Sequence, residues 1–384
     1  MFKIEFIEKR IEEIALAVFV MFVFSTSIII VGYFSLYESD MISMIIKAIR
    51  FFCYGMCLLI FIYYVLSGKY SKNALIVYAI LYSTSIIYLF ISKDAVLLKS
   101  ALLASIVYKI DEDKLIKRGL IVYMMILFTT IILVRLNIID NYVVTMQERI
   151  RDFLGFAYAS FASYYYFFTV LLYVCFRKDK LSYYELIIIE IINYYLFLLT
   201  DTKYSFFITT LLVLIIIIFK IKPSLKQKLI DFKLLKFLPY ILLFITLFLV
   251  LMPENELWNK LDMLVTGRLS LAKKGLETFG ISIFGQAVEL IGYDISAMDV
   301  SYYNYVDSSY IQILIKYGIV NLFIILMIYV ELIDKAIRKN NVYLLIATIL
   351  ILIVAVFEPY LYDLPFNIFP IIGFSGTCAY EKRK

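Results

Sequence analysis

Residues 234–251 read LLKFLPYILLFITLFLVL. The stretch that follows, residues 253–307, begins PENELWNKLD and is the longest polar stretch of the chain. A helix rises 1.5 Å per residue, so about 20 apolar residues cross the roughly 30 Å hydrocarbon core of a bilayer. The first stretch therefore predicts a membrane-spanning helix. The second predicts a long loop, residues 252–308, on one side of the membrane.

The rest of the chain repeats the first pattern. Apolar residues make up 63% of the 384 residues and charged residues 18%, whereas soluble domains have about 45–50% and about 25%. We predict an all-α, polytopic membrane helical bundle that forms one domain, residues 1–384, with about 12 transmembrane helices and the long loop between helices 9 and 10. The predicted spans are residues 14–36, 45–66, 73–91, 94–109, 117–138, 157–176, 183–200, 203–219, 234–251, 309–330, 341–358 and 364–380.

Basic residues alternate between the connections. Lysine and arginine gather in residues 69–72, 109–118, 177–180, 220–236 and 335–339 and at residues 382–384, while the connections between these carry few. Because basic connections stay on the cytoplasmic side, both termini are predicted to be cytoplasmic. The even number of spans agrees with this. The long loop and a shorter one, residues 139–154, then face outward.

Several functions are disfavoured by what the sequence lacks. It has no histidine, which is the commonest metal ligand and general base. It also has no Cys/His cluster and no GxxxxGK[ST] loop, so we predict no metal, no cofactor and no ATPase module. The net charge of +6 lies in the connections of a membrane protein, so we predict no nucleic-acid partner and expect contacts with membrane lipid.

The outward segments carry cations that the topology rule normally disfavours: Arg149, Arg151, Lys203, Arg268, Lys273 and Lys274. Arginine offers a planar fork that grips a phosphate at two points, so Arg151 and Arg268 are candidates for binding a diphosphate. The alternative is contact with lipid headgroups or solvent. Residues 257–279 have one apolar stripe at helical spacing, which predicts a single amphipathic helix at the membrane surface that presents Arg268 sideways.

Three carboxylates lie where outward loops meet helices: Asp307, Glu358 and Asp363. Each could simply mark the membrane interface. In a chain without histidine, each is also a candidate general base or an acceptor for sugar hydroxyls. Two charges fall deeper, Lys99 and Glu190, and at such depth a charge usually faces the bundle interior or a partner.

Four short motifs resemble those of a known family. Residues 149–156, RIRDFLGF, resemble an Arg-rich approach to an L-G-F motif, and residues 199–205, LTDTKYS, resemble a T-x-S-R turn with Lys203 in place of Arg. Thr266-Gly267-Arg268 resembles the G-R start of a long loop. Residues 306–310 and 317–319, VDSSY and YGI, resemble a D-N-x-Y and Y-G-I pair with Ser308 in place of Asn. Over most of residues 135–360 the chain thus resembles the Wzy group, the O-antigen and capsular polysaccharide repeat-unit polymerases, which are related to the O-antigen ligases.

The resemblance implies a membrane glycosyltransferase of the bacterial cytoplasmic (inner) membrane. Its substrates would be undecaprenyl-diphosphate-linked oligosaccharides, and its product a surface polysaccharide such as O-antigen, capsule or exopolysaccharide. Arg149, Arg151, Lys203 and Arg268 would bind diphosphate. Arg268, Asp307 and Glu358 would act in catalysis, without a metal or a protein nucleophile. A chain-length regulator and a flippase of the same pathway would be its partners.

Other functions remain open at this point. A lipid-linked oligosaccharide flippase also has about 12 spans, but it should have short loops on both faces. An O-antigen ligase differs in its acceptor, and its long loop generally contains a histidine, which this chain lacks. A secondary transporter would favour spans broken by Gly or Pro near the middle of the membrane.

Overall fold

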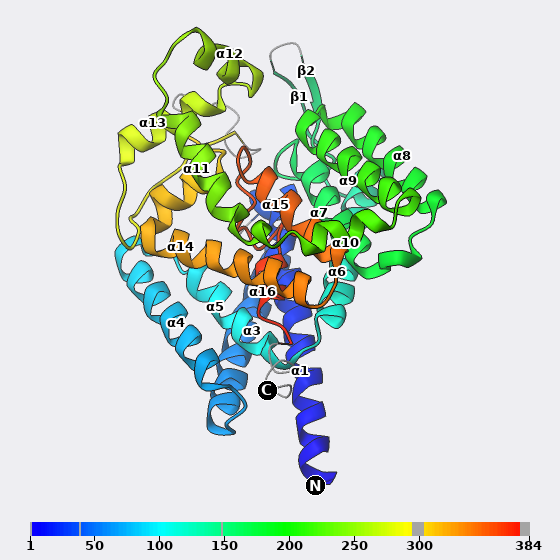
Figure 1. Cartoon of the computed structure of the whole chain (residues 1–384), viewed down its shortest axis with the longest axis vertical. Coiled ribbons are helices and arrows are strands. Elements are labelled where there is room, and N and C mark those ends of the chain that lie inside the picture. The colour runs from blue at the N-terminus through cyan, green and yellow to red at the C-terminus, as the bar shows by residue number, and fades with distance from the viewer. Residues whose placement is uncertain (1, 38–39, 147–148, 294–302, 377–384) are drawn as a thin grey trace.

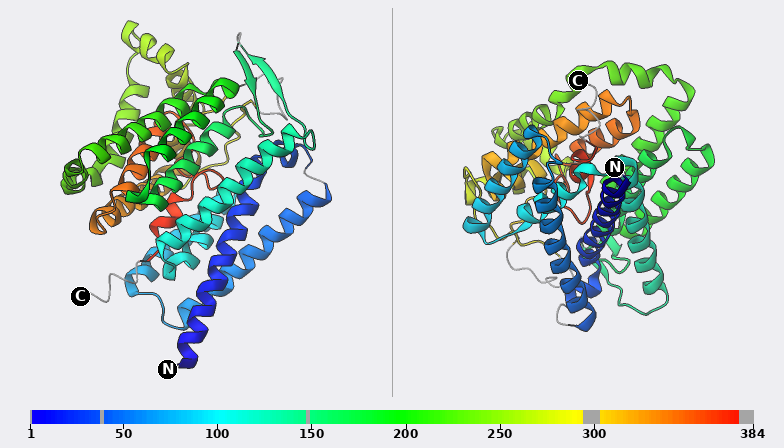
Figure 2. Two further views of the ribbon diagram at one scale, coloured as in Figure 1. Left: turned by 90° about the vertical axis from the view of Figure 1, so that its right-hand side faces the viewer. Right: turned by 90° about the horizontal axis from the view of Figure 1, so that it is seen from below.

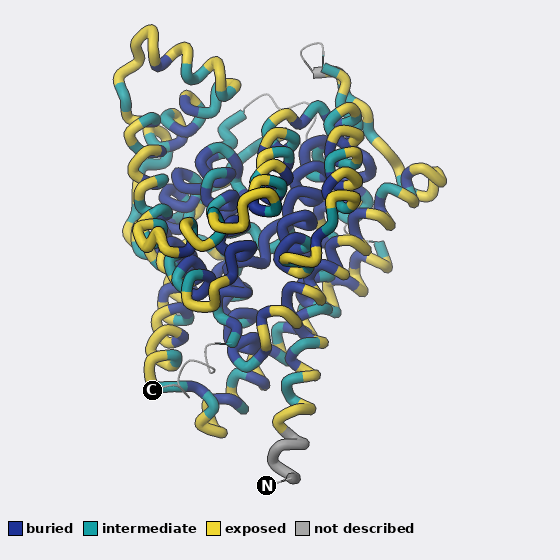
Figure 3. Tube along the Cα trace, turned by 45° about the vertical axis from the view of Figure 1, so that its right-hand side comes forward, coloured by how far each residue is buried: buried dark blue, intermediate teal, exposed yellow. Residues whose placement is uncertain are grey.

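The computed structural model describes residues 2–37, 40–146, 149–293 and 303–376 of the chain (Figure 1). In these residues the fold is nearly all-α, with one two-stranded sheet. Exposed residues cover the outer helices, and buried residues fill the middle of the bundle (Figure 3). The predicted helical class is therefore confirmed.

The first half of the chain forms six helices and the hairpin. They are α1 (Phe2–Ser27), α2 (Gly32–Leu36), α3 (Met41–Leu66), α4 (Lys72–Ser92), α5 (Val96–Ile106), α6 (Glu112–Arg135), β1 (Val143–Met146) and β2 (Arg149–Asp152). Short 3-10 turns follow α1 at Ile28–Ile30 and α5 at Val107–Lys109.

The second half forms the remaining helices. They are α7 (Phe161–Arg177), α8 (Tyr183–Thr200), α9 (Lys203–Ile221), α10 (Ser224–Asp231), α11 (Leu238–Leu251), α12 (Glu256–Leu264), α13 (Arg268–Phe279), α14 (Ser309–Arg338), α15 (Val342–Val354) and α16 (Phe369–Gly373). Further 3-10 turns lie at Lys178–Lys180 and Lys233–Phe237.

Eight helices of the described residues are long and apolar enough to cross a membrane. The four other predicted spans are shorter: residues 94–109 hold only α5 and its 3-10 turn, residues 157–176 hold α7, and residues 341–358 hold α15. The range 364–380 contains only the five-residue helix α16, and its residues 377–380 lie outside the described part. The expectation of a full span there was wrong. These four segments are mostly buried by other helices. A helix that is surrounded by protein does not have to be long enough to cross the hydrocarbon core, because its ends are not exposed to lipid.

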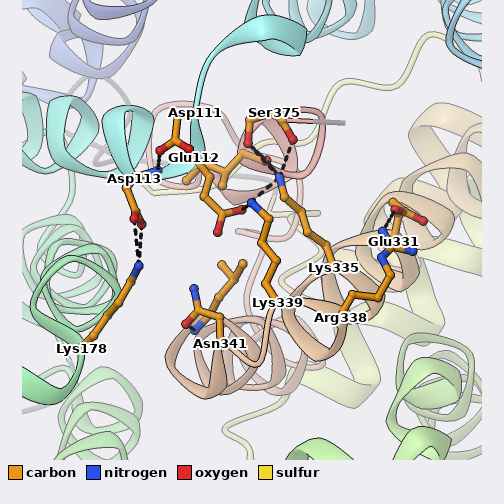
Figure 4. Close-up of polar contacts among 12 residues, drawn as sticks. Asp111, Glu112, Asp113, Lys178, Glu331, Lys335, Arg338, Lys339, Asn341 and Ser375 are labelled. Atoms are coloured by element: carbon orange, nitrogen blue, oxygen red, sulfur yellow. Dashed lines mark hydrogen bonds and ion pairs between the residues drawn. The ribbon is translucent and has the colours of Figure 1, made fainter. Parts of the chain in front are cut away.

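Ion pairs mark one end of the bundle, which we call the basal end. Glu112, at the start of α6, pairs with Lys335 and Lys339 near the end of α14, at 3.2 and 3.0 Å (Figure 4). Lys178, after α7, pairs with Asp113 at 2.7 Å. Lys69, after α3, pairs with Glu8 of α1. The basic connections predicted to lie on one side therefore meet at one end, together with the N-terminal helix.

The opposite end, which we call the apical end, carries the hairpin β1–β2, the turn between α8 and α9, and helices α12 and α13 (Figures 1 and 2). α12 and α13 belong to the long loop. They pack on the end of α11 and the start of α14 through a small apolar cluster that includes Val250, Trp258, Leu269 and Ile311.

The prediction of one amphipathic helix over residues 257–279 was wrong, because the structure has two. Thr266 and Gly267 both adopt positive φ, +58° and +82°, a conformation that ends a right-handed helix. Asp262 then accepts hydrogen bonds from the backbone N–H groups of Leu269 and Ser270, at 2.9 and 3.1 Å. The break sets Arg268 at the first position of α13 instead of in the middle of a surface helix.

A second break lies inside α14, at Gly318, whose φ is +83°. A Cβ there would lie 2.3 Å from the backbone nitrogen of Gly285. The break leaves backbone groups of α14 without helical partners, and the long loop supplies them: Ile319 and Val320 donate to the carbonyls of Ser282 and Ile283, at 3.0 and 3.1 Å. The loop is thereby fastened to the span that follows it.

The hairpin was not predicted. Its strands pair antiparallel, with Val144 opposite Arg151 and Met146 opposite Arg149. Gly155, at φ +80°, follows it, and its carbonyl accepts from the N–H of Gly32, the first residue of α2, at 2.8 Å. A Cβ on Gly155 would meet Val134 at 2.4 Å. The L-G-F motif therefore fixes the hairpin onto α2 and α6.

Candidate functional site

A cavity of about 1220 Å³ opens at the apical end. The hairpin, the α8–α9 turn, α13, both arms of the long loop and the segment after α15 all contribute to its lining. All the predicted site residues lie on it: Arg149, Arg151, Lys203, Arg268, Asp307 and Glu358. Segments as far apart in sequence as Arg149 and Phe366 are therefore brought together on one surface.

The strand β2 presents both of its arginines to the same side. Side chains two positions apart on a strand share a face, and Ile150 between them is exposed on the other. Arg149 pairs with Asp201 through its Nε and donates a second bond to the Asp201 carbonyl. The charge of Arg149 is therefore already balanced by protein.

Arg151 is held differently. Its Nε donates to the carbonyl of Thr200 at 2.9 Å, and its guanidinium lies 5.5 Å from the centre of the Tyr158 ring. It has a longer contact with the hydroxyl of Thr202, at 3.4 Å. These partners are neutral, and the structure gives Arg151 no ion pair with a carboxylate of the described residues. The side chain is oriented while its charge remains unbalanced.

Lys203 begins α9 and is exposed on the cavity wall. Within the described part of the chain it has neither an ion pair nor a hydrogen bond. The turn that carries it is rigid, because the Ser205 hydroxyl donates to the Ser163 carbonyl at 2.9 Å and the hydroxyls of Ser163 and Thr200 lie 2.7 Å apart. Lys203 and Arg151 are therefore the cations of the lining that the protein leaves without a counter-charge.

Arg268 and Glu358 form a buried ion pair. Nη1 of Arg268 lies 2.5 Å from a carboxylate oxygen of Glu358 and donates to the carbonyl of Phe357 at 2.8 Å. The Tyr164 hydroxyl donates to the same carboxylate. The Glu358 side chain is only 4% exposed and that of Arg268 24%, so Glu358 is mainly a fixed partner. Nε and Nη2 of Arg268 have no acceptor in the described residues.

Asp307 is a cavity carboxylate to which no described residue donates a hydrogen bond. Burial raises its pKa to about 7, although the nearby Arg268 charge acts in the opposite direction. The backbone around it is fixed, since the next residues dock: the Ser309 hydroxyl donates to the Glu358 carbonyl at 2.5 Å and accepts from the Leu361 N–H at 3.0 Å.

Asp363, which the sequence also singled out, lies on the same lining. Burial raises its pKa to about 7 as well, and the charge of Lys316 partly offsets this. Its carboxylate has no hydrogen bond to a described residue. The cavity therefore contains two carboxylates that can change charge near neutral pH.

Tyrosines of the long loop complete the wall of the cavity, with Tyr293, Tyr303 and Tyr305 on its lining. Tyr293 and Tyr303 stack with ring centres 4.9 Å apart. The two arms of the loop are joined where Asn304 accepts from the Ile291 N–H at 2.6 Å and donates its own backbone N–H to the Ile291 carbonyl at 3.2 Å. A sugar ring can stack on the flat face of a tyrosine, and its hydroxyl groups can donate hydrogen bonds to a neighbouring carboxylate.

No cluster of three or more potential metal ligands occurs among the residues that the structure describes. The chemistry that the lining offers is anion binding at Arg151 and Lys203, proton acceptance at Asp307, and stacking on tyrosine.

With this geometry defined, the chain was compared with known proteins, and no family model, curated protein or solved structure matches it. The eight apolar helices make it a helical membrane protein.

Proposed function

We propose that this protein is a membrane glycosyltransferase that joins undecaprenyl-diphosphate-linked oligosaccharides into a surface polysaccharide at the outer face of the bacterial cytoplasmic membrane. The observation that carries the proposal is the convergence of unbalanced cations, an unbound carboxylate and tyrosine faces on one apical cavity. The sequence resemblance to repeat-unit polymerases agrees with it.

The cation side of the cavity suits a lipid diphosphate. Arg151 is held in place by neutral groups, and Lys203 has no ion pair or hydrogen bond among the described residues. A bound anion can therefore pair with both cations without displacing a carboxylate. Arg268 adds its Nε and Nη2 donors while Glu358 keeps it oriented. Fixed donors at a leaving group stabilise the negative charge that grows there in the transition state. Removing one such donor typically costs a few kcal/mol of this stabilisation.

The carboxylate side suits the acceptor. In the proposed step a sugar hydroxyl attacks the anomeric carbon of the donor glycan, and the bond from that carbon to the diphosphate oxygen breaks. The hydroxyl proton passes to Asp307, and the lipid diphosphate leaves with the electron pair. A base with a pKa near the working pH is the most effective kind, and the pKa of Asp307, raised to about 7 by burial, meets this condition.

The test is glycan assembly by the purified chain in proteoliposomes supplied with lipid-linked repeat units. Wild type should give a ladder of long glycans. Arg151→Gln should raise the KM for the lipid-linked donor by about tenfold to a hundredfold, since a charged hydrogen bond to phosphate is worth about 1.5–3 kcal/mol.

The matched control is Arg135→Gln. Arg135 lies near the hairpin, but its charge pairs with Asp152 at 3.8 Å and it does not line the cavity, so its KM should stay within about twofold of wild type. Transport of repeat units across the membrane without any lengthening would contradict the proposal and favour a flippase. Transfer of single units onto a different acceptor would favour a ligase.

A further inference from the structure

Two partly buried cations lie between helices without a carboxylate partner among the described residues. Arg50 is in α3, one of the membrane-spanning candidates, and Lys99 is in the short helix α5. Arg50 donates through Nη2 to the Ser25 carbonyl at 2.9 Å, while its Nε is buried without an acceptor. Lys99 lies against the aromatic ring of Tyr54, whose centre is 6.0 Å from Nζ.

Tyr54 connects the two cations. Residues four apart on a helix are neighbours on one face, so Arg50 and Tyr54 lie together on α3. Because α3 packs against α5 and Lys99 lies against the Tyr54 ring, Tyr54 is a neighbour of both cations. The Tyr54 hydroxyl is also buried without a partner in the described residues. Three polar groups that lack acceptors therefore gather at one contact between helices.

The site faces lipid near the apical end. α3 has 26 residues, about 39 Å at 1.5 Å per residue, and Arg50 lies roughly 14 Å from its start. Side chains tilt toward the start of their helix, and long cationic ones extend toward the membrane surface. α3 starts next to the apical hairpin, since Leu36 just before it packs with Phe153. Phe51, beside Arg50, is 72% exposed, so this part of α3 is open to lipid.

Lys99 points toward the same end. α5 starts after Asp94, which pairs with Lys316 at 3.2 Å, and Lys316 lies just before the break where the long loop is fastened to α14. The other deep charge, Glu190, accepts a hydrogen bond from the Thr210 hydroxyl at 2.6 Å, whereas Nε of Arg50 is buried without an acceptor among the described residues. Uncompensated charge at membrane depth is costly, so the two cations need an anion that the described residues do not provide.

We propose that Arg50 and Lys99 bind the phosphate group of an anionic membrane lipid that approaches between α3 and α5 from the apical leaflet. A phosphate has several acceptor oxygens, so it can satisfy the Arg50 fork, the Lys99 ammonium and the Tyr54 hydroxyl together. The lipid's acyl or prenyl chains would lie against the exposed apolar face of α3. None of these three residues lines the apical cavity, and the inference does not depend on the proposed glycosyl transfer.

The test is native mass spectrometry of the full-length protein in detergent, with phosphatidylglycerol, phosphatidylcholine, undecaprenyl phosphate or inorganic phosphate added. We expect retention of an anionic lipid in preference to phosphatidylcholine. Arg50→Gln/Lys99→Gln should weaken this retention about tenfold or more, because each cation near a membrane surface contributes about fivefold. Arg50→Lys keeps the charge and should weaken it less.

The matched control is Lys260→Gln/Lys274→Gln, which removes two charges from the apical helices α12 and α13 and should leave retention unchanged. Thermal unfolding of each variant in the same detergent shows whether it is folded. Preference for undecaprenyl phosphate over phosphatidylglycerol would support the site and identify a prenyl lipid as its ligand. Equal retention of anionic and zwitterionic lipid, equal loss in both double variants, or binding of inorganic phosphate alone would overturn the proposal.

Discussion

The two ends of the bundle differ in how far their charged side chains are paired within the protein. At the basal end, Lys335 is almost fully buried, yet its ammonium donates to the carbonyls of Ile372 and Ser375, at 3.0 and 2.6 Å, and pairs with Glu112 (Figure 4). At the apical end, Arg151 and Lys203 line the cavity and have no carboxylate partner within the described part of the chain, and the Asp307 side chain there accepts no hydrogen bond. These basal charges are satisfied by the fold, whereas Arg151, Lys203 and Asp307 at the apical end remain available to a ligand.

This difference has an energetic meaning. A buried ion pair is costly to break, because the remaining partner loses its compensation in a poorly solvated place. Removing a cavity charge that has no partner in the fold should cost little stability. The ligand, however, loses a contact. Basal substitutions should therefore reduce stability, and apical substitutions should reduce activity.

The largest effect is expected for Asp307→Asn. Loss of a general base typically lowers the rate by about 10²–10⁴-fold, and the isosteric amide should leave the fold intact. The measurement is the initial rate of glycan lengthening in proteoliposomes across pH 5–9. Wild-type activity should rise with pH to half its maximum near 7, where the carboxylate loses its proton, given that burial raises the pKa of Asp307 to about that value.

Asp140→Asn, which changes an apical carboxylate outside the cavity lining, is the control and should behave as wild type. A variant at Asp307 that keeps the wild-type rate and pH profile would exclude it as the base.

The next effect concerns the basal end. Lys335→Met removes the ammonium that holds the segment after α16, and it leaves buried carbonyls and Glu112 less well compensated. The free energy of unfolding should fall by about 3 kcal/mol, measured by denaturant titration in detergent micelles. The activity of each folded molecule should change less than twofold. A stable variant, or a folded variant without activity, would break the contrast between the two ends.

Lys203→Gln is the apical counterpart. Because Lys203 is exposed and has no described partner, its replacement should change the free energy of unfolding by no more than about 0.5 kcal/mol. The KM for the lipid-linked donor should rise by about tenfold, through the loss of one phosphate contact. If stability fell as much as in Lys335→Met, the distinction between structural and ligand-binding charges would be wrong.

The smallest effect is the dependence of stability on pH. Burial raises the pKa of Asp307 and of Asp363 to about 7, above the usual value of 3.8. Between about pH 4 and 7 the folded chain therefore keeps protons that the unfolded chain has released, so stability should fall as pH rises through this window and level off above it. Thermal unfolding at pH 5 and pH 8 should show this fall in wild type. Asp307→Asn should show a smaller one, and equal falls in both would mean that Asp307 does not titrate as described.

Much of the fold could be predicted because lipid imposes simple rules. Apolar runs of the right length identified the eight spanning candidates, and the alternation of basic connections correctly grouped those that meet at the basal end. The lengths of α5, α15 and α16 were missed, since hydropathy does not distinguish a residue surrounded by lipid from one surrounded by other helices. The hairpin was missed because four-residue strands are too short to show their alternation clearly.

Some features of the candidate site could likewise be predicted from the sequence, and others could not. The sequence by itself determined which charges lie in the outward segments, because the energetic cost of placing charge in lipid leaves a visible pattern along the chain. Tertiary structure alone decided which of them are balanced: Arg268 meets Glu358 and Arg149 meets Asp201 across long stretches of chain, while Arg151, Lys203 and Asp307 are left facing the cavity. Pairing depends on distances between segments remote in sequence, and no local pattern of residues encodes such distances.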